Sequence, residues 1–303
     1  MQQTRRQFIK ATSAAGAGLM LSGLPLMAAT KPGSGFKLMV FCTKWGFKGG
    51  FEAFAKAAKK EGFDGIAVGA PKDEKQREVL FEALDKYNLA LGGFSSSGHG
   101  NNFQKHLETY ANSLDNILAI KPRYVNCHAG KDYFTFEQNK QIFEMGIAKS
   151  KQSGIPIYQE THRGRALFAA HLSEDFLNKI PDLRLTLDIS HWCNVAESLL
   201  DDQKAIVNKV LKRVDHIHAR VGFQEGPQVP DFRDPKWKKA TEAHFAWWDE
   251  VARLKKEANE VLTVTPEFGP TDYMWKMPYT GMPVADQWHI NVEMMHAWRK
   301  RYL

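Results

Sequence analysis

The chain is poor in the features that mark several large classes of protein. It has only three cysteines among its 303 residues, Cys42, Cys127 and Cys193, and three cannot all pair within one chain. Their spacing does not match a zinc module, and each falls near an expected strand end, so we expect them to be small core residues. No glycine-rich loop of the phosphate-binding kind stands before a helix. The net charge of +7 is modest and scattered, which argues against nucleic acid as a partner.

Acidic residues are missing altogether from the first 29 positions. There, Thr4-Arg-Arg-Gln-Phe-Ile-Lys10 precedes a run from 11 to 29 that is rich in Ala, Gly and Leu, a pattern typical of a twin-arginine signal peptide. The run is too short and too rich in glycine for a convincing membrane anchor, so we expect cleavage near Ala28 or Ala29. An ordinary buried amphipathic helix is the alternative.

Removal of residues 1–29 would leave a barrel domain at 30–303 with 38 basic and 34 acidic residues, a net charge of about +4. We therefore expect a periplasmic protein that uses the twin-arginine export machinery and has no stable membrane association. That route carries folded proteins, and a common reason to fold first is that a cofactor must be loaded in the cytoplasm. Such export fits a metalloprotein.

Strand and helix signals alternate along the rest of the chain without a long break. Short apolar runs that contain β-branched residues end at turn residues, and apolar residues at helical spacing follow them. Strands are expected at 38–42, 65–68, 89–94, 124–127, 155–160, 183–187, 215–220 and 261–267, and helices at 51–60, 74–86, 102–119, 137–152, 169–178, 195–211, 242–257 and 286–302. This alternation predicts the α/β class and a single (β/α)8 TIM barrel.

The last four expected strands end in residues that are out of place in an apolar core. Glu160, Asp188 and Glu267 each close an apolar run, and the seventh strand carries His216 and His218. Burial of an unpaired carboxylate costs several kcal/mol. An acid in such a position can also cap a helix. However, the carboxyl ends of barrel strands meet at one face, where active sites lie.

Histidines gather at the same strand ends. Six of the eleven lie at or just past an expected strand end, where scattered structural histidines would not concentrate: His99, His128, His162, His191, His216 and His218. We expect His106, His171 and His244, which fall near helices, to be surface residues without a role.

Together these residues resemble the xylose isomerase-like superfamily of sugar isomerases and epimerases, and within it the tagatose 3-epimerase and hydroxypyruvate isomerase group. The resemblance covers strand order from residue 30 onward, and its specific motifs lie in the second half. It implies one divalent metal ion held by Glu160, Asp188, His218 and Glu267. It also implies that Glu160 and Glu267 transfer protons. By strand alternation, His216 would lie one layer deeper in the barrel than His218.

Three carboxylates and one imidazole form an oxygen-rich site that suits Mn2+ above all, with Mg2+, Co2+ and Zn2+ as alternatives. A metal that bridges a carbonyl and an adjacent hydroxyl acidifies the C–H between them and stabilises the enediolate. We therefore predict a metal-dependent isomerase or epimerase of an unphosphorylated sugar or sugar derivative, with a small-molecule carbohydrate as its partner. The alternatives are a lyase that eliminates the aglycone from a 3-keto-glycoside, a sugar-binding barrel without activity, and a buried salt-bridge cluster.

Residues near the strand ends are candidates for substrate binding: His191, His162, Arg220, His128 and Trp45. By the resemblance, His191 orients substrate or hydrogen-bonds a ligand. Arg163 and Arg165 can bind a substrate oxygen or pair with loop acids. The epimerases carry an arginine where this chain has Gln224, so the resemblance does not assign the sugar carbon. The pair Trp247-Trp248 is expected to pack on an outer helix, and the aromatic outer helices leave oligomerisation open.

Overall fold

The computed structural model describes residues 35–98 and 100–303. Within them, eight strands close into a barrel in which each strand is parallel to both neighbours. The strands are β1 (Lys37–Thr43), β2 (Gly65–Gly69), β3 (Ala90–Ser96), β4 (Val125–His128), β5 (Ile157–Glu160), β6 (Leu185–Leu187), β7 (Val214–Ala219) and β8 (Val261–Pro266). The predicted (β/α) barrel is confirmed.

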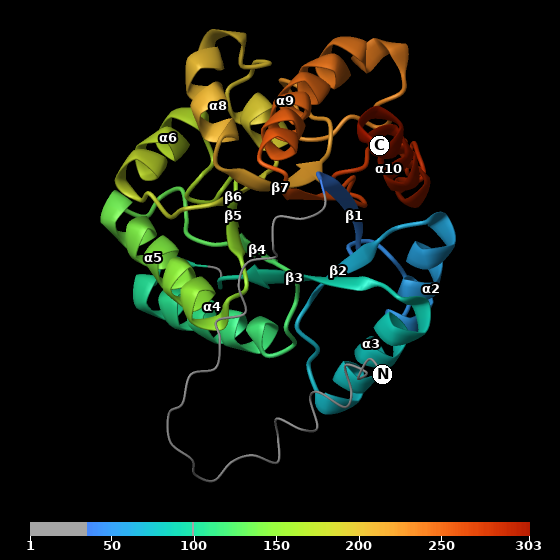
Figure 1. Ribbon diagram of the computed structural model, residues 1–303. Coiled ribbons are helices and arrows are strands. Elements are labelled where there is room, and N and C mark those ends of the chain that lie inside the picture. Colours follow the sequence, from blue (N-terminus) through green and yellow to red (C-terminus); the bar gives the residue numbers. More distant parts are fainter. Residues whose placement is uncertain (1–34, 99) are drawn as a thin grey trace.

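Helices surround the barrel on its outer side (Figure 1). They are α2 (Phe51–Glu61), α3 (Glu74–Tyr87), α4 (Phe103–Leu118), α5 (Phe136–Ser153), α6 (Ala170–Lys179), α7 (Ser190–Val195), α8 (Lys204–Leu211), α9 (Lys238–Glu257) and α10 (Gln287–Tyr302), with short 3-10 helices η1 (Asp201–Gln203) and η2 (Pro235–Trp237). Apolar faces of these helices pack on the outside of the sheet to form the main core. A small second cluster around Met39, Phe41 and Tyr124 fills the barrel interior.

One expected helix, at 195–211, is wrong. The chain instead forms α7 directly after β6, then turns, and continues through η1 into α8. Glu197 and Leu200 adopt left-handed backbone conformations, with φ of 48° and 57°, which interrupt a right-handed helix. Because α7 begins at Ser190, directly after β6, His191 lies in its first turn and close to Asp188.

Other expectations about single residues can be compared with the structure. The three cysteines are buried and free, as expected. Trp248 is fully buried in α9 and lies 5.5 Å from the ring of Trp298 in α10, so this tryptophan does pack between outer helices. The expectation of surface positions is wrong for His106 and His244, which are 3% and 0% exposed, and correct for His171.

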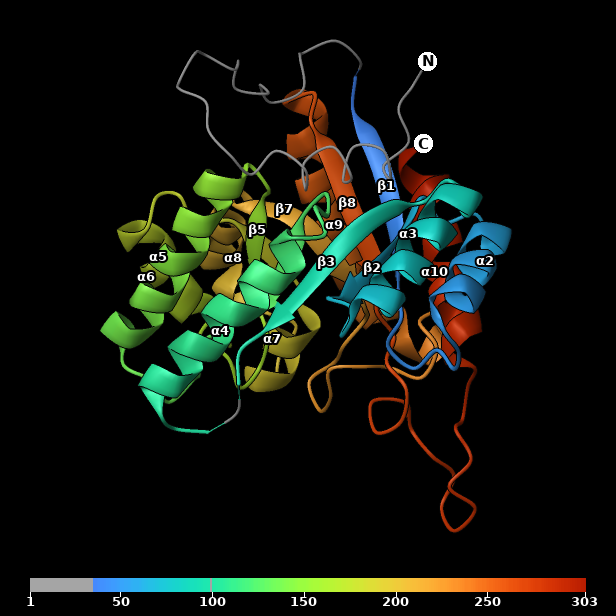
Figure 2. The ribbon, with the colours of Figure 1, turned by 90° about the horizontal axis from the view of Figure 1, so that it is seen from below.

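The expected signal peptide at 1–29 and His99 lie outside the described residues. In the part of the chain that is described, no helix combines the length and the apolar character needed to cross a membrane. Between β8 and α10 the chain makes a long excursion, which Figure 2 shows extending beyond the carboxyl ends of the strands. The same face of the barrel carries the candidate site.

Candidate active site

The carboxyl ends of β5 to β8 bring four metal-ligand side chains together. Glu160 ends β5, Asp188 follows β6, His218 lies in β7 and Glu267 follows β8. One ligand atom from each lies within 4.8 Å of the ligand atoms of the other three. Glu160, Asp188 and His218 are buried, and Glu267 is partly exposed. Four residues that are far apart in the sequence thus share one small volume.

His218 lies between two of these carboxylates. Its Nδ1 is 2.8 Å from Glu267 Oε2 and 3.3 Å from Glu160 Oε2. Burial opposes the charged form, but Glu267 and Glu160 together raise the pKa of His218 well above its usual value. A metal ion that took this nitrogen as a ligand would have to displace its proton.

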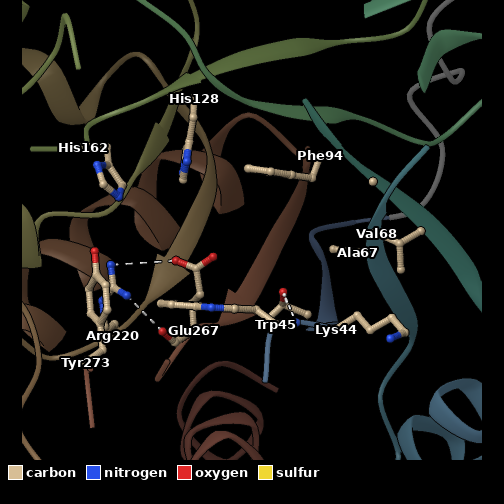
Figure 3. Close-up of a pocket in the computed structure, with 12 residues that line it drawn as sticks. Lys44, Trp45, Ala67, Val68, Phe94, His128, His162, Arg220, Glu267 and Tyr273 are labelled. Carbon is tan, nitrogen blue, oxygen red and sulfur yellow. Dashed lines mark hydrogen bonds and ion pairs between the residues drawn. The ribbon is translucent and has the colours of Figure 1, made fainter. Parts of the chain in front are cut away.

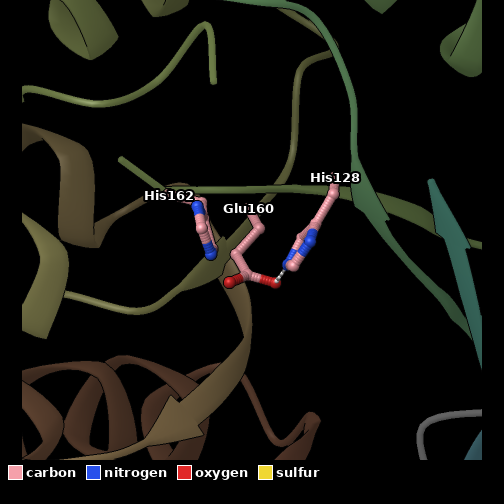
Figure 4. Close-up of side chains that lie close together, drawn as sticks. All are labelled: His128, Glu160 and His162. Carbon is pink, nitrogen blue, oxygen red and sulfur yellow. Dashed lines mark hydrogen bonds and ion pairs between the residues drawn. The ribbon is translucent and has the colours of Figure 1, made fainter. Parts of the chain in front are cut away.

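Glu160 is held by two neighbours on β4, of which Figure 4 shows His128. His128 Nε2 lies 2.7 Å from Glu160 Oε2, and the side-chain amide of Asn126 donates to the same oxygen at 2.5 Å. Burial alone would raise the pKa of this carboxyl, but His128 and His218 hold it well below its usual value. The other oxygen, Oε1, is buried and has no hydrogen-bond partner in the described part of the chain.

Asp188 is paired with a buried arginine. Its Oδ1 accepts hydrogen bonds from the backbone and hydroxyl of Ser190, and its Oδ2 accepts from Arg220 Nη2. Arg220 also donates to the backbone oxygen of Glu267 at 3.3 Å, and its guanidinium lies 4.7 Å from the ring centre of Tyr273. Burial raises the pKa of Asp188 to about 6, against the opposing effect of Arg220.

Two neutral imidazoles, His162 and His191, lie beside this pair, with ring centres 3.9 Å apart and the ring planes tilted by 44°. Nδ1 of His162 lies 2.6 Å from the backbone oxygen of Arg163. Because a carbonyl can only accept, Nδ1 carries the proton and Nε2 keeps a lone pair. Burial and His128 lower the pKa of His162 to about 3. His191 accepts from Arg220 at Nε2, 2.9 Å away, so its proton is on Nδ1, which is buried without a described partner.

A cavity of about 350 Å³ opens beside these groups. Figure 3 shows two unlike sides: polar side chains on one, and on the other small or apolar side chains together with the charged side chain of Lys44. The polar side consists of His128, His162, Arg220 and Glu267, and the other includes Ala67, Val68, Phe94 and Trp45. Trp45 makes an edge-to-face contact with Tyr273, with ring centres 5.0 Å apart. The cavity can therefore hold a molecule with one polar and one apolar part.

The four ligand side chains fit a divalent metal ion. Glu160 Oε1 is a buried oxygen without a partner, which is costly unless something binds it. Three carboxylates with one imidazole form a donor set suited to hard divalent ions. A second group, His128, Glu160 and His162, also comes close enough to hold an ion. It shares Glu160, however, and His128 already hydrogen-bonds to that carboxylate.

Of the residues singled out in the sequence, Glu267, His128, His162, Arg220 and Trp45 line this cavity, and Glu160, Asp188, His218, His191 and His216 do not. His191 does not line the cavity and lies behind His162 and Arg220. His216 lies deeper in the barrel, as strand alternation predicted, with Nδ1 2.8 Å from Thr263 Oγ1 and its ring 4.3 Å from that of Tyr124.

Sequence reasoning missed Asn126 and Phe94, and it did not foresee the contacts of Tyr273, although the segment from Glu267 to Tyr273 was expected to form part of the pocket wall. A signal existed for Asn126, since an amide in the middle of the apolar run 124–127 is out of place in a buried strand. Tyr273 lies in the long segment after β8 and contacts Arg163, Arg220 and Trp45. Nothing in the sequence around it indicates that these contacts would form.

No protein-family model matches the chain, and no curated protein matches it. Solved structures do. A 3-keto-D-glucoside 4-epimerase from E. coli has a TM-score of 0.59 at 12% identity, over 87% of this chain and 100% of the epimerase. A D-psicose 3-epimerase has a TM-score of 0.56 at 12% identity, over 88% and 99%. A xylose isomerase-like TIM barrel protein from Mycobacterium smegmatis, in complex with magnesium, has a TM-score of 0.54 at 12% identity, over 77% and 91%.

Identities this low show the fold alone. The chain has the fold of the xylose isomerase-like sugar isomerases and epimerases, which confirms the resemblance seen in the sequence at that level. Because one fold hosts many reactions, the function has to be argued from the site.

Proposed function

We propose that the protein is a divalent-metal-dependent enzyme that isomerises or epimerises an unphosphorylated sugar or sugar derivative. The observation that carries the proposal is the meeting of Glu160, Asp188, His218 and Glu267 at the carboxyl face of the barrel, with their ligand atoms within 4.8 Å of one another. Active sites of this barrel type lie at that face. The sugar isomerases and epimerases of like fold support the substrate class.

These four side chains would hold one ion, with Mn2+ preferred and Mg2+, Co2+ or Zn2+ as alternatives. When bound, the ion would supply positive charge for the enediolate that forms when a C–H next to a carbonyl loses its proton. We assign the ion to these residues rather than to His128, Glu160 and His162, because the first set offers three carboxylates.

Glu160 and Glu267 are the proposed acid and base. Glu160 ends β5 and Glu267 follows β8, and both carboxylates lie near His218 Nδ1, at 3.3 Å and 2.8 Å. One removes the proton and either one returns it. His128 and Asn126 hold the Glu160 carboxylate in place while it does so.

The walls of the cavity suggest how the sugar binds. His162 presents the lone pair of Nε2, so it can accept a hydrogen bond from a sugar hydroxyl. Arg220 can donate to a keto or hydroxyl oxygen, while Trp45 offers an aromatic face for stacking. His191 holds Arg220 and so acts on the substrate only through that residue.

The runner-up is a lyase that eliminates the aglycone from a 3-keto-glycoside. The apolar side of the cavity, with Ala67, Val68 and Phe94, favours this reading because a free sugar has no apolar group to place there. The likeness to a 3-keto-D-glucoside 4-epimerase is compatible with it. A sugar-binding barrel without activity is the third candidate.

Metal analysis and proton exchange test the proposal together. The protein from residue 30 is purified without chelators, and bound metal is measured for the wild type, Glu160→Gln, Glu267→Gln and Glu225→Gln. Glu225 is an exposed acid, so its variant controls for charge. We expect about one ion per chain in the wild type and the control, and less in the other two. Wild type that stays metal-free in excess Mn2+ or Zn2+ would exclude the proposed chemistry.

The metal-loaded protein is then incubated with sugars and 3-keto-glycosides in D2O. Solvent deuterium in a recovered sugar or its isomer identifies an isomerase or epimerase. A released aglycone identifies the lyase. Sugar binding without either product, unchanged in Glu160→Gln and Glu267→Gln, would leave the sugar-binding barrel.

We also propose export by the twin-arginine route, on the grounds of Arg5 and Arg6 and the apolar run to residue 29. The intact mass of protein from the periplasm should correspond to a chain that begins near residue 30. An Arg5→Lys, Arg6→Lys variant should remain in the cytoplasm at full length.

A further inference from the structure

Two cations lie on neighbouring loops, just past the ends of β4 and β5. Lys131 follows β4 and is 9% exposed, and Arg165 follows β5. Nη1 of Arg165 is buried and has no hydrogen-bond partner among the residues described. Arg163 on the same loop differs, because it donates to Asn194 at 3.0 Å and lies over the Tyr273 ring.

The backbone holds this arrangement in place. A Cβ on Gly130 would lie only 2.8 Å from Ala166 Cβ, so the loops after β4 and β5 touch one residue before Lys131 and one residue after Arg165. The side chain of Asn139 binds both backbone groups of Lys131, at 3.1 Å to the N–H and 2.9 Å to the oxygen. The two cations are therefore placed by the fold, and their proximity does not depend on a mobile loop tip.

Lys131 and Arg165 carry like charges, which repel each other. Burial lowers the pKa of Lys131, and Arg165 lowers it further, against the attraction of Asp132. Burial also lowers the pKa of Arg165, against the attraction of Glu160 and Asp132. A partly buried pair of cations is unfavourable unless an anion binds to it. A guanidinium fork beside an ammonium group suits a carboxylate, which can accept several charge-assisted hydrogen bonds.

The pair also lies near the proposed site. Arg165 is five residues past Glu160 and, together with His162, belongs to the loop that follows β5. His128, the last residue of β4, and His162, on the loop after β5, line the cavity, whereas Lys131 and Arg165 are not among its lining residues. Glu160 and Tyr273 both act electrostatically on Arg165, which places its charge near the proposed site.

We infer that Lys131 and Arg165 bind a carboxylate group of the substrate, so that the substrate class is a sugar acid, such as a uronic or aldonic acid, and not a neutral sugar. The inference rests on the proposed function in that it takes the cavity to be the sugar site. The same cations would also attract a free anion such as inorganic phosphate, and the test separates these sources.

Binding of matched sugars tests the inference without relying on turnover. Calorimetry on the metal-loaded protein compares glucuronate with glucose and galacturonate with galactose, each pair differing at one carbon. We expect at least one acid to bind about tenfold or more tightly than its neutral partner, because charge-assisted hydrogen bonds are the strong ones. Lys131→Gln and Arg165→Gln should abolish that preference. Arg165→Lys, which keeps the charge but loses the fork, should retain part of it.

Lys204→Gln is the matched control, since it removes one positive charge from an exposed side chain on α8. It should leave the preference unchanged, and circular dichroism checks that all variants are folded. Acids that bind no more tightly than neutral sugars in both pairs would overturn the inference. So would a preference that persists in Lys131→Gln and Arg165→Gln, or phosphate binding at these residues without any preference for the acids.

The outcome is distinguishable from failure of the proposed function. If the protein binds no metal and exchanges no proton, but binds the acid more tightly through Arg165, this inference stands and the proposed reaction fails. If the protein is a metal-dependent enzyme that binds acids and neutral sugars equally well, the proposed reaction stands and this inference fails.

Discussion

His244 accepts a hydrogen bond at Nε2 from the backbone N–H of Gly222, with 3.1 Å between the two nitrogens. Its other nitrogen lies 2.8 Å from the backbone oxygen of Ala240, to which Nδ1–H donates. A residue of α9 thus holds the loop that follows Arg220, and only the neutral imidazole can make both bonds. Burial lowers the pKa of His244 to about 4.

This geometry predicts that stability falls as the pH is lowered from 6.5 to 4. In that range the unfolded chain binds a proton at His244 and the folded chain does not, so the free energy of unfolding rises with pH. Between pH 6.5 and 4, His244 should change the free energy of unfolding by about 3 kcal/mol in total, at 1.36 kcal/mol for each unit by which its pKa is lowered. Urea unfolding at a series of pH values measures it.

His244→Gln should be less stable at pH 7, since it loses the contact with Gly222, but its stability should depend less steeply on pH between 6.5 and 4. The control is His171→Gln, which alters an exposed histidine on α6. Equal slopes for the wild type and His244→Gln would contradict the prediction.

A second prediction concerns Gly222 itself. A Cβ added there would lie 2.7 Å from Ser190 Cβ and 2.8 Å from the Ser190 backbone oxygen, closer than packed atoms tolerate. Gly222→Ala should therefore lower the free energy of unfolding by roughly 1–3 kcal/mol. Gly69→Ala, where an added Cβ meets nothing within 4 Å, should have a small effect. Comparable losses in the two variants would show that the contact with Ser190 is not the cause.

The barrel and the four-residue cluster could be predicted from the sequence because both depend on local patterns. Apolar runs locate the strands, and an acid or a histidine at a strand end stands out against them, as Glu160 and His218 do. Parallel strand order then brings those ends to one face. No knowledge of side-chain contacts is needed for that step.

Contacts between loops could not be predicted in the same way. The approach of Gly130 to Ala166 and the stacking of Tyr273 on Arg220 arise from segments with no periodic pattern. His244 was misjudged for a related reason: a histidine at helical spacing gives no sign that a glycine from a distant loop will reach its free nitrogen. The break between α7 and α8 likewise depends on left-handed backbone at residues without the usual turn signals.

A third prediction follows from the pairing of Arg220 with Asp188. In Arg220→Gln, Asp188 remains buried without its cation, so the metal-free protein should lose about 3–5 kcal/mol of stability. A divalent ion bound to Asp188 would supply the missing charge. Saturating Mn2+ should therefore stabilise Arg220→Gln more than it stabilises the wild type.

Thermal or urea unfolding with EDTA and with Mn2+ measures these two increments. Arg184→Gln serves as the comparison, because Arg184 pairs with Asp215, away from the proposed ligands. It should be destabilised without any added response to metal. Equal metal increments in the wild type and Arg220→Gln would mean that Asp188 is not a ligand.

The last prediction concerns the wall formed by Trp45. An added Cβ on Gly269 would lie 2.2 Å from the Trp45 indole, so the ring packs directly on this glycine, two residues past Glu267. Tyr273 contacts the same ring, and Gln287 donates to the Trp45 backbone oxygen at 2.8 Å. The indole therefore packs against Gly269 and Tyr273, and its backbone is held by Gln287.

Gly269→Ala should push the indole out of position and weaken sugar binding roughly threefold to tenfold, the range expected for loss of one aromatic contact. Metal content should not change, because neither residue is a proposed ligand. Trp45→Ala should weaken binding to a similar extent, and adding Gly269→Ala to it should have little further effect, since the clash then has no partner. Calorimetry with the best-binding sugar on all four proteins completes this cycle. Additive losses in the double variant would show that Gly269 acts on the sugar site by a route other than Trp45.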